Sequence, residues 1–168
     1  TTRPDTIFGV TFIVLAPEHE LATILASKEQ KKQVEKYIDR IKNKSERERK
    51  SEVKKITGVF TGSYAEHPIT CKKLPIWIAD YVLPNYGTGA IMAVPCGDQR
   101  DWNFANYYGI EIINVFKDIN ISAGANENKD VIINNSEELT NLHSLEAIEK
   151  SIEILKKKGV AEKAITYR

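Results

Sequence analysis

Short runs of β-branched and aromatic residues alternate along the chain with stretches in which apolar residues recur at helical spacing. Segment 7–15 (IFGVTFIVL) is almost wholly apolar and predicts a buried strand. A helix is expected to follow Pro17 and to continue to about residue 27. A longer helix is expected from Lys28, because one apolar stripe is formed by Val34, Tyr37, Ile38 and Ile41. The same criteria predict further strands at 57–64, 69–72, 74–79, 88–94, 111–116 and 163–168.

Two more helices have recognisable ends. Asp98 resembles an N-cap, with Asp101 at the third helical position as in a capping box, and Gly109 is a fitting stop. Segment 144–158 has an apolar stripe and is closed by Gly159. We therefore expect helices on both sides of the polar, loop-like region that separates them.

The order of these elements predicts the fold class. Strands and helices are mixed irregularly, unlike the regular alternation of a doubly wound parallel sheet. We expect residues 1–168 to form a single α/β domain with a mixed β-sheet and peripheral helices. A chain of 168 residues is long enough to bury a sizeable core.

Composition and charge narrow the range of functions. Hydrophobic residues make up 42% of the chain and charged residues 28%, as in ordinary soluble proteins. The sequence contains no apolar run long enough to cross a membrane and opens with no secretory signal. The only cysteines, Cys71 and Cys96, form no CxxC pair, which favours a reducing, cytoplasmic location with free thiols.

The net charge of +1 conceals an uneven distribution. Residues 28–55 hold 12 Lys or Arg against 6 Asp or Glu, so the remainder of the chain is slightly acidic. Such a basic segment can meet a polyanion, although a solvated helix face with ion pairs is the more common role of a charge run. The near-neutral total argues against autonomous, tight binding of nucleic acid.

Two segments far apart in sequence concentrate the candidate chemistry. Segment 1–6 (TTRPDT) supplies three hydroxyls and a cation, and segment 87–101 supplies an apolar strand followed by a turn with two carboxylates. Together they could hold a small amino acid by its ammonium group, its carbonyl oxygen and its side chain. The three histidines show no metal-ligand spacing and no catalytic Ser-His-Asp or Cys-His set is evident, so we expect neither a metal nor a cofactor.

These segments also carry a family resemblance. The chain resembles the editing domain of bacterial-type leucyl-tRNA synthetases over nearly its whole length, and the resemblance rests on TTRPDT at 1–6, TGVFTGSYAEHPIT at 57–70, LPIWIADYVLPNYGTGAIMAVP at 74–95 and DQRDWNFA at 98–105. The HIGH and KMSKS signatures of the synthetic core are absent, so this chain alone should not activate leucine. The resemblance implies a barrel-like mixed sheet in an insertion domain of a larger synthetase.

The resemblance implies post-transfer editing, in which water hydrolyses the ester of norvaline, isoleucine or methionine wrongly joined to leucine tRNA. A second, hydrolytic sieve is needed because binding pockets discriminate poorly between side chains that differ by one methylene. The implied partners are the 3′ end of the misacylated tRNA and the rest of the synthetase in the same chain. We expect a monomer and no contact with membrane.

Four residues carry the implied chemistry. Asp101 would bind the α-ammonium group, although its sequence position alone favours a plain capping role. Thr1 and Thr2 would hold the carbonyl oxygen and the attacking water, where composition alone indicates only generic threonines at a chain end. Thr6 would exclude leucine by the bulk of its γ-methyl group, where the residue alone indicates the start of a strand.

The remaining candidates would line the substrate pocket. Arg3 would contact the terminal phosphate or ribose, or else pair with Asp5 nearby. Tyr86 would shape the pocket or stack near the terminal adenosine. Two pairs complete the set: Met92 and Val94 as an apolar wall or core residues, and Asp98 and Arg100 as a loop-holding cap and a tRNA contact or an ion pair.

One departure from the family pattern leaves other functions open. The family usually has a histidine just before the DQRD motif, where this chain has Cys96-Gly97, so Cys96 could line the site or, less commonly, act as a nucleophile. The alternatives are a module that binds the tRNA end without turnover, and an insertion that has lost editing. The editing domains of isoleucyl- and valyl-tRNA synthetases are related in kind, but the TTRPDT and YGTGAIMAVP motifs favour a leucyl-tRNA synthetase.

Overall fold

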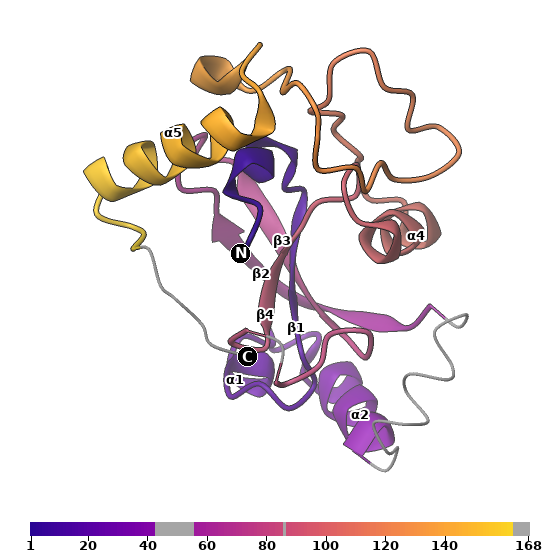
Figure 1. Ribbon diagram of the computed structural model, residues 1–168. Helices are drawn as coiled ribbons and strands as arrows, with labels where there is room; N and C mark the ends of the chain where they lie inside the picture. Colours follow the sequence, from indigo (N-terminus) through magenta and orange to yellow (C-terminus); the bar gives the residue numbers. More distant parts are fainter. Residues whose placement is uncertain (43–55, 86, 163–168) are drawn as a thin grey trace.

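A computed structural model describes residues 1–42, 56–85 and 87–162 (Figure 1). A twisted sheet runs through the centre, with α1 and α2 at one end and α5 and α4 at the other (Figure 1). The elements in chain order are the 3₁₀ helix η1 (Pro4–Gly9), β1 (Phe12–Leu15), α1 (Leu21–Ile24), α2 (Lys31–Lys42), β2 (Gly58–Glu66), β3 (Lys73–Ala79), β4 (Ala90–Ala93), α4 (Gln99–Tyr108), the 3₁₀ helix η2 (Glu137–Leu139) and α5 (Ser144–Lys157).

The sheet has the strand order β2-β3-β1-β4. β1 runs parallel to β3 and antiparallel to β4, with Ile13 opposite both Ile76 and Met92, and β2 runs antiparallel to β3. The predicted class, a mixed sheet with peripheral helices, is confirmed. Within the described residues the four strands form an open sheet with β2 and β4 at its edges, so the barrel-like closure is not seen there.

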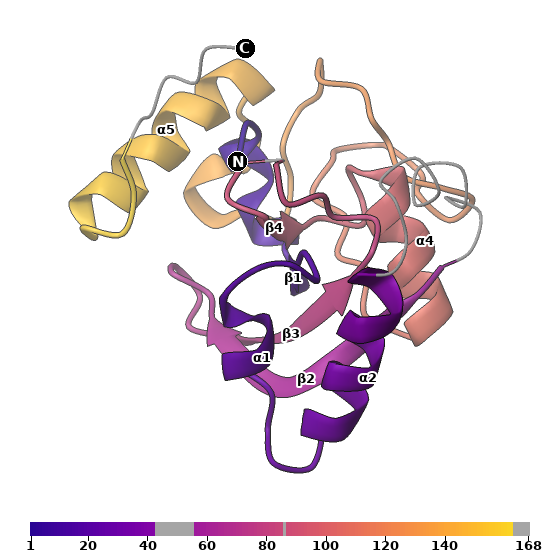
Figure 2. The same cartoon turned by 90° about the horizontal axis from the view of Figure 1, so that it is seen from below.

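The two faces of the sheet are covered by different helices, because successive side chains of a strand point to opposite faces. Leu15 of β1 packs with the α2 stripe, and all four predicted stripe residues of α2 are buried. Phe12, on the other face, is fully buried and stacks on Phe104 of α4 with 5.4 Å between ring centroids. Figure 2 shows α1 and α2 on the viewer's side of β2 and β3, and the two helices contact each other.

A third apolar cluster lies at the end of the sheet and supports the candidate site. It joins η1, the residues after β4, the loop region 112–139 and α5. Helix α5 packs directly against η1. Helix η1 is therefore held between the sheet and α5, and each of its residues except Phe8 is buried.

Several predicted elements differ from those observed. Residues 4–9 form a 3₁₀ helix, because Pro4 fixes a helical φ at its first position, and only residues 12–15 of the predicted first strand belong to β1. The helix expected after Pro17 is limited to α1, and residues 69–72 form a turn rather than a strand. The segment predicted at 163–168 lies outside the described residues.

The strand predicted at 111–116 is also wrong, and Asn114 explains why. Its side chain accepts a hydrogen bond from the Phe116 amide at 3.0 Å and donates to the Ile119 carbonyl at 2.8 Å. Such local side-chain bonds compete with a strand ladder for the backbone groups. What remains is one isolated bridge between Phe116 and Ile133.

The helices with strong end signals were predicted correctly. The Asp98 carboxylate accepts from the amides of Arg100 and Asp101, and Gly109 ends α4 with φ 66° in the left-handed region. α5 begins at Ser144, as predicted. Its N-cap is His143, whose side chain accepts a hydrogen bond from the Leu145 amide. None of the helices in the described ranges is long and apolar enough to cross a membrane.

Candidate functional site

The fold brings residues 7–9, which directly follow the first candidate segment, into contact with the second candidate segment. Gly9, at the end of η1, lies so close to the residues after β4 that a Cβ atom there would be 3.2 Å from both Val94 Cγ1 and Cys96 Sγ. Ile7 shares one buried apolar cluster with Val94 and Cys96. The N-terminal hydroxyl-bearing segment and the carboxylate-bearing turn therefore form one continuous region.

Asp101 is the most unusual charged group of this region. It lies in the first turn of α4 and is only 4% exposed. Its Oδ1 accepts a hydrogen bond from the Tyr81 hydroxyl at 2.7 Å, and its Oδ2 accepts from the Val94 amide at 2.9 Å. The carboxylate thus connects α4 to the end of β4 and to the loop after β3.

Burial raises the pKa of Asp101 to about 7, and the negative charge of Asp98 acts in the same direction. The hydrogen bonds from Tyr81 and Val94 and the charge of Arg100 oppose this effect without cancelling it. A carboxylate in this state lacks the solvation that it would have in water. A cation placed against it would therefore favour its ionised form.

Asp98 and Arg100 form a separate pair at the same helix terminus. Arg100 Nη2 lies 2.9 Å from Asp98 Oδ2, with half of the arginine side chain exposed. Burial opposes ionisation of Asp98, but hydrogen bonds and charge from Arg100 outweigh it and lower the pKa of Asp98. The capping role predicted for Asp98 is confirmed, and the ion-pair alternative for Arg100 is the one present.

The threonines of segment 1–6 differ in how firmly they are held. Thr1 and Thr2 are exposed, and Thr1 Oγ1 accepts from the Arg3 amide at 3.0 Å. Thr6 is only 2% exposed, and its hydroxyl donates to the Arg3 carbonyl at 2.9 Å. Because that bond fixes the side-chain rotamer, the γ-methyl group of Thr6 has one defined direction.

Arg3 is held by Asp5, the second of its two predicted contacts. The guanidinium donates from Nε to Oδ1 at 3.0 Å and from Nη2 to Oδ2 at 2.7 Å. Asp5 is fully buried, so this two-pronged pairing compensates a carboxylate that has no access to water. A contact between Arg3 and a phosphate or ribose stays a prediction.

The predicted apolar wall lies at the edge strand. Met92 is opposite Ile13 in β4 and is partly buried, and Val94 is 6% exposed in the cluster with Ile7. Both therefore pack against the core beside η1. Tyr86 lies outside the described residues, so its predicted role is not placed.

Cys96 is a core residue. Its side chain is fully buried in the apolar cluster, and burial raises the pKa of its thiol to about 11. A nucleophilic cysteine needs a lowered pKa and access to substrate. The structure therefore argues against the nucleophile alternative and assigns the thiol to packing against Gly9.

Sequence reasoning missed two residues that hold this region. Tyr81 donates to Asp101, and His67 Nε2 donates to the Ile7 carbonyl, 2.9 Å away. The available signals were weak: a tyrosine at a strand end, and a histidine before a proline in a turn. Within the described ranges, no group of three or more His, Cys, Asp or Glu side chains is placed to hold a metal ion.

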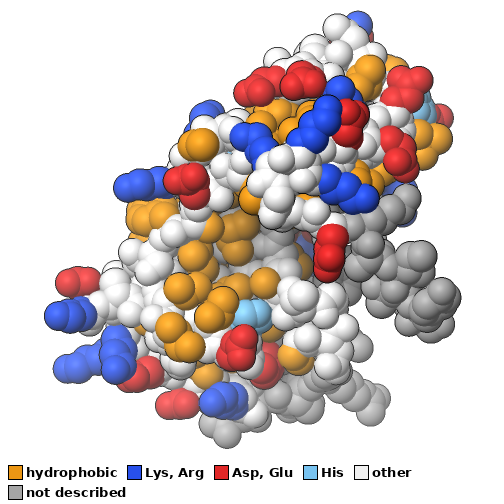
Figure 3. Space-filling view, turned by 90° about the vertical axis from the view of Figure 1, so that its left-hand side faces the viewer, with side chains coloured by type: hydrophobic (Ala, Val, Ile, Leu, Met, Phe, Trp, Pro, Cys, Tyr) orange, Lys and Arg blue, Asp and Glu red, His pale blue; other side chains and the backbone are white. Residues whose placement is uncertain are grey.

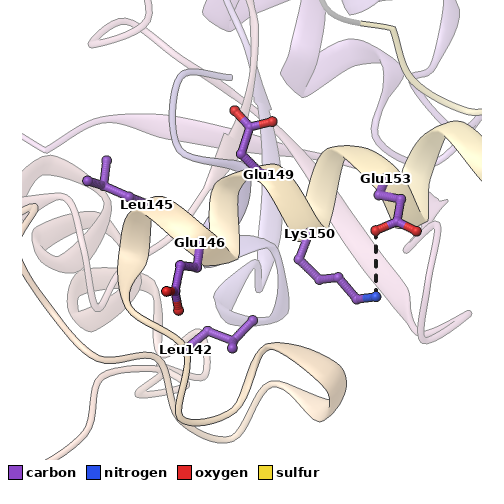
Figure 4. Close-up of a pocket in the computed structure, with 6 residues that line it drawn as sticks. All are labelled: Leu142, Leu145, Glu146, Glu149, Lys150 and Glu153. Carbon is purple, nitrogen blue, oxygen red and sulfur yellow. Dashed lines mark ion pairs between the residues drawn. The ribbon is translucent and has the colours of Figure 1, made fainter.

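A shallow hollow on α5 lies apart from these groups. Its lining is drawn in Figure 4 and consists of Leu142, Leu145, Glu146, Glu149, Lys150 and Glu153. Figure 3 shows acidic and basic side chains interspersed over the upper part of this side of the molecule, and on α5 Glu153 pairs with both Lys150 and Lys157. None of the predicted site residues lines the hollow, so we interpret it as an ordinary solvated helix surface.

Comparison with known proteins identifies the family. The family model described as leucyl-tRNA synthetase, editing domain, matches residues 1–156. Leucine–tRNA ligases of Christiangramia forsetii and Flavobacterium johnsoniae are 51% and 52% identical over the whole chain. The crystal structure of a ternary complex of an Agrobacterium radiobacter LeuRS with tRNA and LeuAMS matches 94% of the chain with a TM-score of 0.68 and 32% identity.

The chain spans only part of these proteins. It corresponds to 18% of the length of each of the two ligases and to 16% of the solved synthetase chain. The match to the family model, by contrast, includes every candidate site residue discussed above. The chain belongs to the leucyl-tRNA synthetase editing-domain family.

Proposed function

We propose that this domain performs post-transfer editing, the hydrolysis of the ester that joins a wrong amino acid to leucine tRNA. The substrates are tRNAs that carry norvaline, isoleucine or methionine, and leucine is excluded. Family membership supports the reaction class. The observation that carries the proposal is the buried, incompletely compensated carboxylate of Asp101, which is bonded to Val94, a residue that packs against Gly9 at the end of η1.

Asp101 binds the α-ammonium group of the misattached amino acid. An aminoacyl ester has a free amino group, which supplies the cation that the buried carboxylate lacks. Each oxygen of Asp101 accepts one hydrogen bond from the protein, which leaves each oxygen with a further lone pair for the ammonium hydrogens. Tyr81 and Val94 hold the carboxylate in place, so little reorganisation accompanies binding.

The hydroxyls of Thr1 and Thr2 act on the ester itself. Water attacks the carbonyl carbon, and the negative charge that develops on the carbonyl oxygen is stabilised by hydroxyl donors. In related chemistry, one such donor lowers the activation barrier by about 3 kcal/mol. The bond from the carbonyl carbon to the ribose oxygen then breaks, and that oxygen takes a proton from solvent or through the neighbouring ribose hydroxyl. No covalent intermediate with the protein is formed.

Thr6 supplies the discrimination. Its rotamer is fixed by the bond to the Arg3 carbonyl, so its γ-methyl group presents a rigid obstacle. The branched end of leucine meets this obstacle, whereas straighter or differently branched side chains pass it. Met92 and Val94 form the apolar wall opposite, and the contacts to the tRNA end come from Arg3, Tyr86, Asp98 and Arg100.

The domain acts as a monomeric insertion within a larger synthetase, which delivers the 3′ end of the tRNA. The similar Agrobacterium radiobacter protein was solved as a complex with tRNA, which supports tRNA as the partner. Although exposed basic side chains outnumber acidic ones on α2, the net charge of the whole chain is only +1. Most of the binding energy for tRNA is therefore expected from the remainder of the synthetase.

The decisive test is deacylation of norvalyl-tRNA by the full-length synthetase. Replacing Asp101 with Ala should lower the single-turnover rate by about 10²–10³-fold, because the ammonium loses its fixed anion. Asp101→Asn keeps the size and one acceptor, and it should lose a similar factor because it lacks the charge.

The exposed carboxylate of Glu111, which lies outside the site, provides the matched control. Glu111→Ala should leave the rate unchanged. An Asp101→Asn enzyme that still deacylated norvalyl-tRNA normally would remove Asp101 from the site. A wild-type enzyme that bound the misacylated tRNA without cleaving it would show a binding module instead.

A further inference from the structure

His67 is a buried histidine that connects two distant parts of the chain. It lies in the turn between β2 and β3 and is 3% exposed. Its Nδ1 accepts hydrogen bonds from the amides of Ile69 and Thr70, both at 3.1 Å. Because backbone amides only donate, Nδ1 carries no hydrogen and Nε2 carries one. Nε2 therefore donates to the Ile7 carbonyl at 2.9 Å.

The acceptor of this bond lies directly beside the discriminating threonine. Ile7 follows Thr6 in η1, and its carbonyl also accepts from the Val10 amide at 3.2 Å. The ring of Phe8 contacts the imidazole with 6.1 Å between centroids. The turn that contains His67 thus grips the C-terminal half of η1.

The end of η1 is also fixed by packing against the residues after β4. Gly9 lies so close to Val94 and Cys96 that an added Cβ would be 3.2 Å from a side-chain atom of each. Packing opposes movement of η1 toward β4, whereas the His67 bond opposes movement away from the β2–β3 turn. Together they define where η1 lies relative to Val94.

We propose that His67 is a positioning residue for amino-acid discrimination. By holding the Ile7 carbonyl, it keeps the Thr6 γ-methyl group at the place where it excludes leucine. The imidazole touches backbone groups and Phe8 rather than any group assigned to the reaction, so it acts through η1. This inference rests on the proposed editing function. It adds a residue of the β2–β3 turn to those that determine amino-acid selectivity.

Two substitutions test the hydrogen bonds of the two imidazole nitrogens one at a time. Asn places an oxygen near the position of Nδ1, so His67→Asn keeps an acceptor for the turn and loses the bond to Ile7. Gln places an amide nitrogen near the position of Nε2, so His67→Gln keeps the donor to Ile7 and loses the turn acceptor. A purely structural histidine would tolerate or suffer from both changes alike.

Hydrolysis of leucyl-tRNA and norvalyl-tRNA by the full-length synthetase is the first readout. His67→Asn should raise the leucyl-to-norvalyl rate ratio about tenfold, because a small displacement of Thr6 opens the pocket to leucine. His67→Gln should stay within about twofold of wild type. Equal ratios in the two variants, or loss of cleavage of both esters in His67→Asn, would overturn the proposal.

Hydrogen exchange provides a readout that does not depend on editing. His67→Asn should accelerate exchange in peptides that cover residues 3–11, and His67→Gln in peptides that cover residues 67–73. Unchanged exchange at residues 3–11 in His67→Asn would refute the positioning role. If the wild-type enzyme cleaved neither ester, the editing function would fail by itself, while the exchange pattern would still decide whether His67 holds η1.

Discussion

The two halves of the candidate site are held together by different means. The turn at 94–101 has a local frame, with Asp98 capping the helix that begins beside it and Asp101 bonded to the Val94 amide, to which Tyr81 and the Asn126 amide add bonds from outside the turn. Segment 1–9 also has local bonds, such as the Arg3–Asp5 pair, but its place in the fold is set by distant residues, through the His67 bond to Ile7 and the packing of Gly9. In the proposed mechanism, the turn supplies the charge, and segment 1–9 supplies the hydroxyls and the steric block.

This difference bears on function. A fixed charge needs a rigid helix terminus, which a capping residue provides with few other contacts. A steric block must instead lie at a set distance from the opposite pocket wall, which only contacts across the fold can define. Changes in segment 1–9 should therefore alter which amino acid is cleaved, and changes in the turn should alter how fast it is cleaved.

The strongest expected effect on selectivity belongs to Thr6. Thr6→Ala removes the γ-methyl group and should increase leucyl-tRNA hydrolysis by about 10–100-fold, the range that one methyl-sized contact commands. Norvalyl-tRNA hydrolysis should change little. Single-turnover deacylation of both esters by the full-length enzyme measures the shift.

Thr23, which is exposed in α1, offers a matched control. Thr23→Ala should leave both rates unchanged. If Thr6→Ala failed to increase cleavage of the leucyl ester, the steric role of Thr6 would be wrong. Segment 1–9 would then not be the half of the site that sets selectivity.

Substitutions at Gly9 and Gly97 compare how tightly the two halves of the site are packed, by their effect on the free energy of unfolding. In Gly9→Ala the new methyl group would lie 3.2 Å from three side chains, Val94, Cys96 and Val115. Overpacking of this kind should lower the free energy of unfolding by about 1–3 kcal/mol. In Gly97→Ala, within the turn, the nearest atom is a Phe116 ring carbon at 3.4 Å, an ordinary contact, so a change under about 0.5 kcal/mol is expected.

Urea denaturation of the two glycine variants measures both effects. Equal destabilisation would show that the turn is packed as tightly as η1. A neutral Gly9→Ala would show that the close approach between the two segments is not rigid.

The same contrast explains how much of the molecule the sequence could predict. Helices α2, α4 and α5 follow from apolar stripes and end signals that lie within each helix. The mixed order of strands and helices correctly indicated a mixed sheet. Such features depend on neighbouring residues, and a single sequence displays them directly.

Features that depend on distant contacts were not predictable in this way. The apolar run 7–15 suits a strand, but residues 7–9 belong to η1, and the Ile7 carbonyl is held there by His67 from the β2–β3 turn. Resemblance singled out Asp101, but nothing in the sequence showed that Tyr81 would be its donor. The partner of a buried polar group is set by the fold, so it appears only in the structure.

The smallest effect is expected from Tyr81, and it tests the charge of the turn. Binding of the ammonium requires ionised Asp101, so the editing rate should rise with pH through the pKa of about 7. The Tyr81 hydroxyl lowers that pKa, so Tyr81→Phe should move the rise to higher pH and leave the rate at high pH nearly unchanged. The exposed Tyr107 provides the control, and Tyr107→Phe should leave the profile in place.

Stability should respond to pH with the opposite sign. The folded pKa of Asp101 lies above its unfolded value, so the folded state binds the proton more tightly between about pH 4 and 7. The contribution of this group to the free energy of unfolding is therefore fully present below that range and is lost as the pH rises through about 7. Urea midpoints at pH 5 and pH 8 should show this loss in wild type and lack it in Asp101→Asn, whereas a loss that persisted in Asp101→Asn would assign it to another group.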